Sequence, residues 1–173
     1  EDIASGSLAA LHGGYTTITA FPNIKPVSDS VERLLALKKL IQEKALVSVL
    51  PVAAITEGLE GKKLTPIADL AKNGAVAFTD DGKGVQDFSL ALKAMQAIQK
   101  TGLPFLIHAE NELLAQDGVM HSGKVSEKLN LKGIPPEAEE SMTARDLILA
   151  KLTQAQIHFC HVSTAYAAKI IKL

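Results

Sequence analysis

The sequence predicts an α/β fold in which short parallel strands alternate with helices. Five segments rich in β-branched and apolar residues are each followed by a segment with helical periodicity. This alternation predicts a parallel sheet, because a helical crossover returns the chain to the same end of the sheet. Two layouts satisfy the pattern, namely a doubly wound sheet and a (β/α)8 barrel.

The predicted strands are short runs of Val, Ile, Thr and Phe bounded by turn residues. They cover residues 15–20, 47–55, 75–79, 104–108 and 156–162. The first ends before Pro22, which lacks the backbone N–H needed for further ladder pairing and leaves Asn23 in a loop. The fourth has an apolar interior and ends abruptly at His108.

The predicted helices have apolar residues along one side and stop signals at their ends. They cover residues 1–12, 31–44, 66–72, 88–100, 137–152 and a last segment from Thr164. Ser28 or Asp29 is expected to cap the helix over 31–44. Residues 112–136 contain a short helix near 113–114, but their glycines, prolines and charges otherwise predict a long irregular loop that is functional or mobile.

Composition restricts the classes of protein to which the chain can belong. Its 173 residues suit one domain, with 47% hydrophobic and 21% charged residues and a net charge of −1. This balance gives no reason to expect nucleic acid or an anionic membrane as a partner, and no run approaches the ~18 apolar residues of a membrane span. The single cysteine, Cys160, excludes an internal disulfide and predicts a reducing, cytoplasmic location.

The ends of the chain bear on the choice of layout. Glycines after the third strand lack the spacing of a phosphate-binding loop, so nothing favours the doubly wound sheet. Five units are too few for a barrel of ~250 residues. However, the chain begins with Glu1 rather than Met and stops within a helical pattern. We therefore expect residues 1–173 to be the central part of one barrel domain, with both ends of the domain missing.

Three predicted strands end in side chains that bind metals. The third ends at Asp81, the fourth at His108 and the fifth at His161. In a parallel sheet these tips lie on one edge, so one carboxylate and two imidazoles can converge. Such a set suits Zn²⁺, which lowers the pKa of its water to near 7 and polarises a carbonyl. The sequence thus predicts a zinc site and hydrolysis of an amide, or the reverse reaction.

Side chains alternate along a strand, which predicts the faces of the neighbouring residues. Residues two positions before each tip should share its inward face; these are Thr79, Leu106 and Phe159. Residues expected on the outer, helix-covered face are Asp80, His158 and Cys160. We expect structural roles for the remaining candidates, namely helix-end His12, solvated His121, packed His158, core Cys160 and salt-bridged Arg145. Glu110 could orient a ligand histidine.

Several motifs resemble those of the dihydroorotase family, of the class I type within the amidohydrolase superfamily. They occur in consistent order at residues 13–17, 21–23, 78–82, 108–111, 133–146 and 161–164. The resemblance implies a (β/α)8 barrel with about five of eight units present. It implies one or two Zn²⁺ ions bound by Asp81, His108 and His161, and substrate binding by Asn23. Related hydantoinases and allantoinases have a carboxylated lysine where Asp81 stands.

The same resemblance implies a reaction, the reversible cyclisation of N-carbamoyl-L-aspartate to L-dihydroorotate in pyrimidine synthesis. The family's His-x-His pair should lie just before Glu1 and its catalytic aspartate beyond Leu173, so no catalytic residue is expected within the chain. One alternative is an inactive barrel that scaffolds aspartate transcarbamoylase, and another is a hydantoinase or allantoinase. The implied partners are a small-molecule substrate and a second copy of the chain in a homodimer or larger oligomer.

Overall fold

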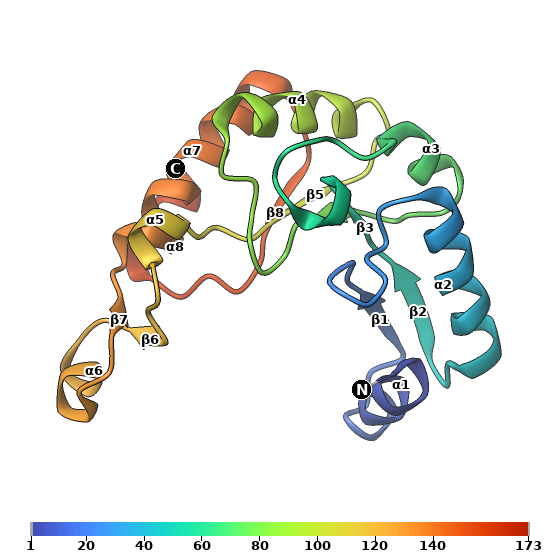
Figure 1. Cartoon of the computed structure of the whole chain (residues 1–173), viewed down its shortest axis with the longest axis horizontal. Helices are drawn as coiled ribbons and strands as arrows, with labels where there is room; N and C mark the ends of the chain where they lie inside the picture. Colours follow the sequence, from blue (N-terminus) through green and yellow to red (C-terminus); the bar gives the residue numbers. More distant parts are fainter. Residues whose placement is uncertain (1, 173) are drawn as a thin grey trace.

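The computed structural model describes residues 2–172 and has the shape of an arch (Figure 1). Most helices follow the outer side of the arch, and most strands follow its inner side. Glu1, where the sequence predicts the first helix to begin, and Leu173 lie outside the described residues. None of the helices within residues 2–172 combines the length and the hydropathy that a membrane span needs.

The strands of the arch are parallel, which confirms the predicted α/β class. They are β1 (Thr17–Ala20), β2 (Ser48–Pro51), β3 (Ala53–Ala54), β4 (Phe78–Thr79), β5 (Phe105–Ile107) and β8 (Ile157–Phe159). β1 pairs with β2, and a second sheet has the order β3-β4-β5-β8. The single strand predicted over 47–55 is therefore divided at Val52. Its two parts stay in one row, because Pro51 O accepts a hydrogen bond (3.0 Å) from Val76 N, just before β4.

The predicted helices are present with nearly the expected bounds. They are α1 (Ile3–His12), α2 (Val31–Lys44), α3 (Ile67–Lys72), α4 (Phe88–Gln99), α7 (Glu137–Thr153) and α8 (Ala165–Ile171). The N-cap of α2 is Ser30, whose side chain accepts from Arg33 N, so the expectation of Ser28 or Asp29 was wrong. Asp29 instead binds Arg33 and accepts from Gly58 N, which ties α2 to the loop after β3.

The segment predicted as a long irregular loop contains regular structure. It forms α5 (Glu112–Ala115), β6 (Met120–His121), α6 (Lys124–Leu129) and β7 (Gly133–Ile134). β6 and β7 pair in parallel, and Figure 1 shows them extending from the arch beyond α5. A short 3-10 helix, η1 (Glu57–Leu59), was also not predicted. Two-residue strands and one-turn helices are too short to produce a readable periodicity.

The hydrophobic core lies between the strands and the outer helices. Phe78 of β4 is fully buried in the same cluster as Leu70 of α3, Met95 of α4 and Leu149 of α7. Phe105 and Ile107 of β5 belong to this cluster, so the opposite face of β5 carries Leu106. The core therefore fixes which residues of each strand turn away from the helices.

The predicted faces of β8 were wrong. Ile157 and Phe159 pair in register with Phe105 and Ile107 and pack against the core beneath the helices. His158 pairs with Leu106 and lies on the other face, where it is exposed. Strand alternation back from His161 would place His158 on the helix-covered face, but β8 ends at Phe159 and the turn that follows interrupts the alternation.

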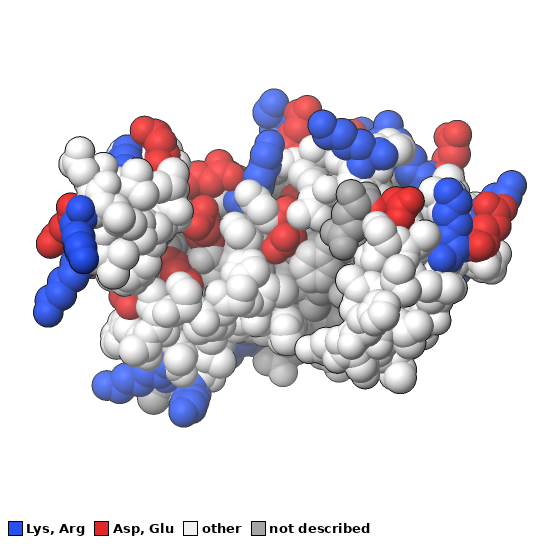
Figure 2. Space-filling view, turned by 90° about the horizontal axis from the view of Figure 1, so that it is seen from below, with Lys and Arg blue, Asp and Glu red and all other residues white. Residues whose placement is uncertain are grey.

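Charged side chains do not form a single-sign patch on the face shown in Figure 2. Basic residues lie mostly around its margins, several acidic residues lie nearer its middle, and a broad part of this face is uncharged. Exposed large apolar side chains occur in both halves of the chain, including Leu11, Leu50, Leu113 and Leu152.

Candidate metal centre

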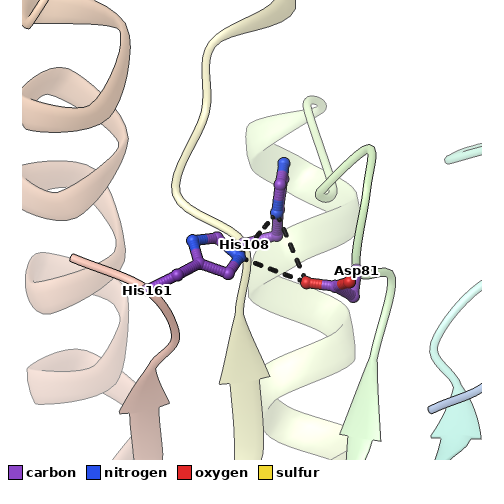
Figure 3. Close-up of side chains that lie close together, drawn as sticks. All are labelled: Asp81, His108 and His161. Atoms are coloured by element: carbon purple, nitrogen blue, oxygen red, sulfur yellow. Dashed lines mark hydrogen bonds and ion pairs between the residues drawn. The ribbon is translucent and has the colours of Figure 1, made fainter. Parts of the chain in front are cut away.

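Asp81, His108 and His161 point toward one another from the ends of three neighbouring strands, β4, β5 and β8 (Figure 3). His161 Nε2 lies 3.2 Å from Asp81 Oδ1, and His108 Nδ1 lies 3.4 Å from the same oxygen. The two imidazole nitrogens are 3.0 Å apart. Three groups separated by up to 80 positions in the sequence therefore form one compact triangle.

The size of the triangle is compatible with a zinc ion. Zn²⁺ lies about 2.0–2.1 Å from nitrogen and oxygen ligands in tetrahedral sites, which separates neighbouring ligand atoms by about 3.3–3.4 Å. The measured edges of 3.0–3.4 Å agree with that spacing. The donor set of one carboxylate and two imidazoles also suits Zn²⁺. The side chains of His108 and Asp81 are 15% and 18% exposed, whereas that of His161 is 54% exposed, so the site opens to solvent on the His161 side.

Asp81 is fixed by its neighbour Asp80, which points the opposite way, as alternation predicts. Asp80 is buried and accepts hydrogen bonds from Ile55 N, Thr56 N and Thr56 Oγ1. Burial raises the pKa of Asp80, and the hydrogen bonds from Thr56 and Ile55 oppose that rise. These bonds tie the end of β4 to the end of β3 and so locate Asp81.

The loop after Asp81 is held against the end of β5. Gly84 has φ +67°, and a Cβ at this position would lie 2.7 Å from His108 O. Gln86 donates from Nε2 to Glu110 O (2.9 Å) and accepts at Oε1 from Glu112 N (3.2 Å). The separation of Asp81 and His108 therefore depends on close backbone packing as well as on the sheet.

His161 reaches the other two candidate ligands through a turn rather than through strand alternation. Cys160 N donates to Ile107 O (3.0 Å), which is the last ladder bond on this side. His161 then has φ +39°, in the left-handed region that non-glycine residues seldom adopt. This backbone reversal directs the imidazole toward Asp81.

Asn23 also lies at the site. It is exposed in the segment after β1, and its Nδ2 donates to Asp81 Oδ2 at 3.4 Å. The two oxygens of Asp81 are thus divided, with Oδ1 facing the histidines and Oδ2 facing Asn23. Its predicted role in substrate binding stays a prediction.

The other candidates are placed as follows. His12 is exposed in the last turn of α1, as expected of a helix-end residue. Cys160 is half-buried. Its burial and, to a smaller extent, the nearby charge of Asp81 raise the pKa of its thiol, which disfavours a nucleophilic thiolate. The prediction that His158 packs inside was wrong, because it is exposed. Arg145 forms the expected structural salt bridge, a largely buried ion pair with Asp146 (2.7 Å).

A cavity of about 250 Å³ adjoins the candidate metal centre. His108, Glu110, Glu139 and His161 contribute to its wall, and so does His121 of β6. His121 is exposed, as expected, but the sequence did not indicate that β6 would bring it beside the site. Among the described residues, no hydrogen bond joins the Glu110 carboxylate to either ligand histidine, so its predicted orienting role has no contact to support it.

Two polar residues beside the site, Gln86 and Glu139, were not singled out from the sequence as site residues. Gln86 bridges the loops that follow β4 and β5. Glu139, on the first turn of α7, accepts hydrogen bonds from Ser163 and Thr164 beyond β8. Both residues form hydrogen bonds to loops that are distant in the sequence. A polar Gln or Glu in a helix or loop is usually solvated, so its residue type does not indicate such a long-range contact.

Comparison with known proteins identifies relatives along nearly the whole chain. The dihydro-orotase-like family model matches residues 1–167. A dihydroorotase of Bacillus cytotoxicus is 46% identical over 172 residues, which cover 99% of this chain and 40% of that protein. Dihydroorotases of Macrococcus caseolyticus and Bacillus cereus are 44% and 45% identical over the same shares. The chain thus spans about 40% of the length of these relatives.

Solved structures share the fold at lower identity. An L-hydantoinase (dihydropyrimidinase) from Arthrobacter aurescens superimposes with a TM-score of 0.80 at 21% identity, covering 98% of this chain and 39% of that protein. A D-hydantoinase from Bacillus sp. AR9 gives a TM-score of 0.72 at 22% identity, covering 99% and 39%. At this identity the likeness establishes the fold alone.

The family match, the relatives at about 45% identity and the strand-end triangle of one carboxylate and two imidazoles agree with one another. The chain belongs to the dihydro-orotase-like family.

Proposed function

We propose that this chain is the metal-binding central part of a zinc-dependent dihydroorotase, which interconverts N-carbamoyl-L-aspartate and L-dihydroorotate. The observation that carries the proposal is the triangle of Asp81, His108 and His161, whose edges match the ligand spacing of zinc. Relatives named dihydroorotase, at 44–46% identity, support this reaction over that of the hydantoinases, which share only the fold.

The proposal includes the domain. Residues 1–173 would be five of eight units of one (β/α)8 barrel, and the remaining units would lie before and after them. The continuous row of parallel strands supports this, as does the coverage of about 40% of each relative. We further propose a cytoplasmic homodimer or larger oligomer, and the exposed large apolar side chains support burial against further protein.

Each of the four site residues has a definite part in the proposed chemistry. Asp81, His108 and His161 would hold one or two Zn²⁺ ions, and Asp81 Oδ2 is the ligand oxygen that does not face the histidines. Zinc, when bound, supplies water of lowered pKa and polarises a carbonyl. Asn23 has an amide N–H beside the site, suited to a substrate carboxylate or carbonyl. An aspartate beyond Leu173 would move the proton at the ring nitrogen.

The test combines metal analysis with an assay of the polypeptide encoded by the complete gene. We expect dihydroorotate hydrolysis and bound zinc in the unchanged protein, and loss of both in His108→Ala and His161→Ala. His158→Ala is the matched control, because His158 lies on β8, three residues before His161, without a place in the triangle. Full zinc occupancy in both ligand variants would refute the metal assignment.

The same assays separate the alternatives. An inactive barrel that scaffolds aspartate transcarbamoylase would show no hydrolysis of any cyclic amide, and its gene would lack a His-x-His before Glu1. A hydantoinase or allantoinase would hydrolyse its own substrate in preference to dihydroorotate.

A further inference from the structure

Glu139 makes an unusually complete set of contacts with the turn that follows His161. Its Oε1 accepts from Ser163 N (3.0 Å), Thr164 N (2.9 Å) and Thr164 Oγ1 (3.2 Å). Its Oε2 accepts from Ser163 N (3.0 Å) and from Ser163 Oγ. One carboxylate therefore binds every backbone and hydroxyl donor of two consecutive residues.

The turn needs such an anchor because its conformation is unfavourable. A non-glycine residue at positive φ is retained only where the surrounding structure overdetermines it. On the N-terminal side of His161, the bond from Cys160 N to Ile107 O fixes the chain to β5. On the C-terminal side, Glu139 fixes Ser163 and Thr164. His161 thus lies between two fixed points of the backbone. The first is held by a backbone hydrogen bond, and only the second is held by a side chain, Glu139, which can be replaced.

We propose that Glu139 is a positioning residue, which sets the His161 turn so that the imidazole lies within coordinating distance of Asp81 and His108. The inference rests on the proposed metal centre and assigns it a fourth, non-ligand residue. Glu139 acts through backbone N–H groups rather than by touching the imidazole.

The helix that carries Glu139 supports this role. Ala138 O, in the same turn of α7, accepts from Asn111 N (2.9 Å) in the loop after His108. Farther along α7, Arg145 donates to Val85 O (2.8 Å) and Gln86 O (3.1 Å) in the loop after Asp81. The three ligand-bearing loops are therefore all hydrogen-bonded to one rigid element, and Glu139 supplies the link to the most exposed ligand.

A catalytic role for Glu139 is the competing explanation, because Glu139 also contributes to the cavity wall. Both of its oxygens, however, already accept hydrogen bonds from the turn. Burial alone would raise the pKa of Glu139, but hydrogen bonds from Ser163 and Thr164 outweigh it and hold the pKa below its ordinary value. A carboxylate held in this way is a weak base and a firm anchor.

The test measures Zn²⁺ and Co²⁺ affinity of the metal-free full-length protein by chelator competition, without any assay of turnover. Glu139→Asp keeps the charge but withdraws the carboxylate by one methylene, whereas Glu139→Gln keeps an acceptor oxygen in place but removes the charge. Positioning predicts affinity lowered by about 10–100-fold in Glu139→Asp and Glu139→Ala, and by less than about 3-fold in Glu139→Gln. A Co²⁺ absorption spectrum altered as in His161→Ala would show that the same ligand is displaced.

Glu140→Ala is the matched control, because Glu140 lies in the same turn of α7 and no hydrogen bond links it to the His161 turn in the described part of the chain. Wild-type affinity in Glu139→Asp, or a greater loss in Glu139→Gln than in Glu139→Asp, would overturn the inference. Thermal unfolding of each metal-free variant separates misfolding from mispositioning. If His161→Ala also retains metal, the proposed metal centre itself fails; if only the Glu139 variants retain it, the centre stands and the positioning role falls.

Discussion

Gly84→Ala tests whether backbone packing, rather than the sheet alone, sets the distance between Asp81 and His108. Gly84 has φ +67°, and an added Cβ would lie 2.7 Å from His108 O. Gly102→Ala is a closely matched control, because Gly102 has φ +72° with no atom within 4 Å of its Cβ position. Both substitutions place alanine in the left-handed region, but only the first also meets backbone.

The expected magnitudes follow from these two differences. An alanine in the left-handed region costs roughly 1–2 kcal/mol, so both variants should lose about that much unfolding free energy. A C···O contact closer than about 3.3 Å must relax, which displaces the Asp81 loop or the end of β5 by about 0.6 Å. Metal sites tolerate distance errors of only about 0.2 Å. We therefore expect Gly84→Ala to bind zinc at least ~10-fold more weakly and to lose ~1 kcal/mol more stability than Gly102→Ala.

The assay is zinc titration of the metal-free protein together with urea unfolding. Gly102→Ala should bind zinc within about 2-fold of wild type despite its lower stability. Equal zinc affinities for the two variants would refute the reasoning, because they would show that the loop yields without moving Asp81. Equal stabilities combined with unequal affinities would show instead that the contact relaxes entirely at the metal centre.

Three further predictions concern the Arg145–Asp146 ion pair, the Glu139 carboxylate and the exposed His158. Arg145→Met should lower the unfolding free energy by about 3–5 kcal/mol in urea unfolding, because it leaves the buried Asp146 carboxylate unpaired; a loss below ~1 kcal/mol would contradict this. The stability difference between wild type and Glu139→Gln should be largest above the ordinary carboxyl pKa of 4.5 and should vanish as pH falls through the lowered pKa of folded Glu139. The reason is that the lowered pKa reflects stabilisation of the ionised carboxylate by the folded state, and this stabilisation is lost when the carboxylate is protonated. A difference that grows on acidification would reverse that sign. His158→Ala should leave zinc affinity within about 2-fold of wild type in chelator competition, and a larger loss would place His158 at the site.

Long elements with strong periodicity were predictable. The helix over 31–44 has the predicted bounds, because its apolar side and polar exposed side repeat over four turns. The strand over 47–55 was predicted as one piece, but it divides at Val52 into β2 and β3, each with its own neighbour. A local pattern of apolar residues does not carry the information about which strand pairs at each position.

The geometry of the candidate metal centre was predictable in part for a similar reason. Asp81 and His108 follow directly from strands whose faces the core fixes, so alternation correctly assigned their direction. The place of His161 at a strand end was predictable, but the predicted faces of the β8 residues before it were wrong. The strand stops at Phe159, and the imidazole is directed by a positive-φ turn.

The sequence by itself determined that parallel strands alternate with helices and that three strand ends carry side chains of metal-ligand type, because apolar periodicity and strand-end chemistry are local properties. Tertiary structure alone decided how those ends meet. The His161 turn is fixed by Glu139 and the Asp81 loop by Gln86 and Gly84, across sequence separations of about 24 residues. Such contacts arise from hydrogen-bond donors and backbone surfaces that meet only after the helices have packed on the sheet, so no local pattern encodes them.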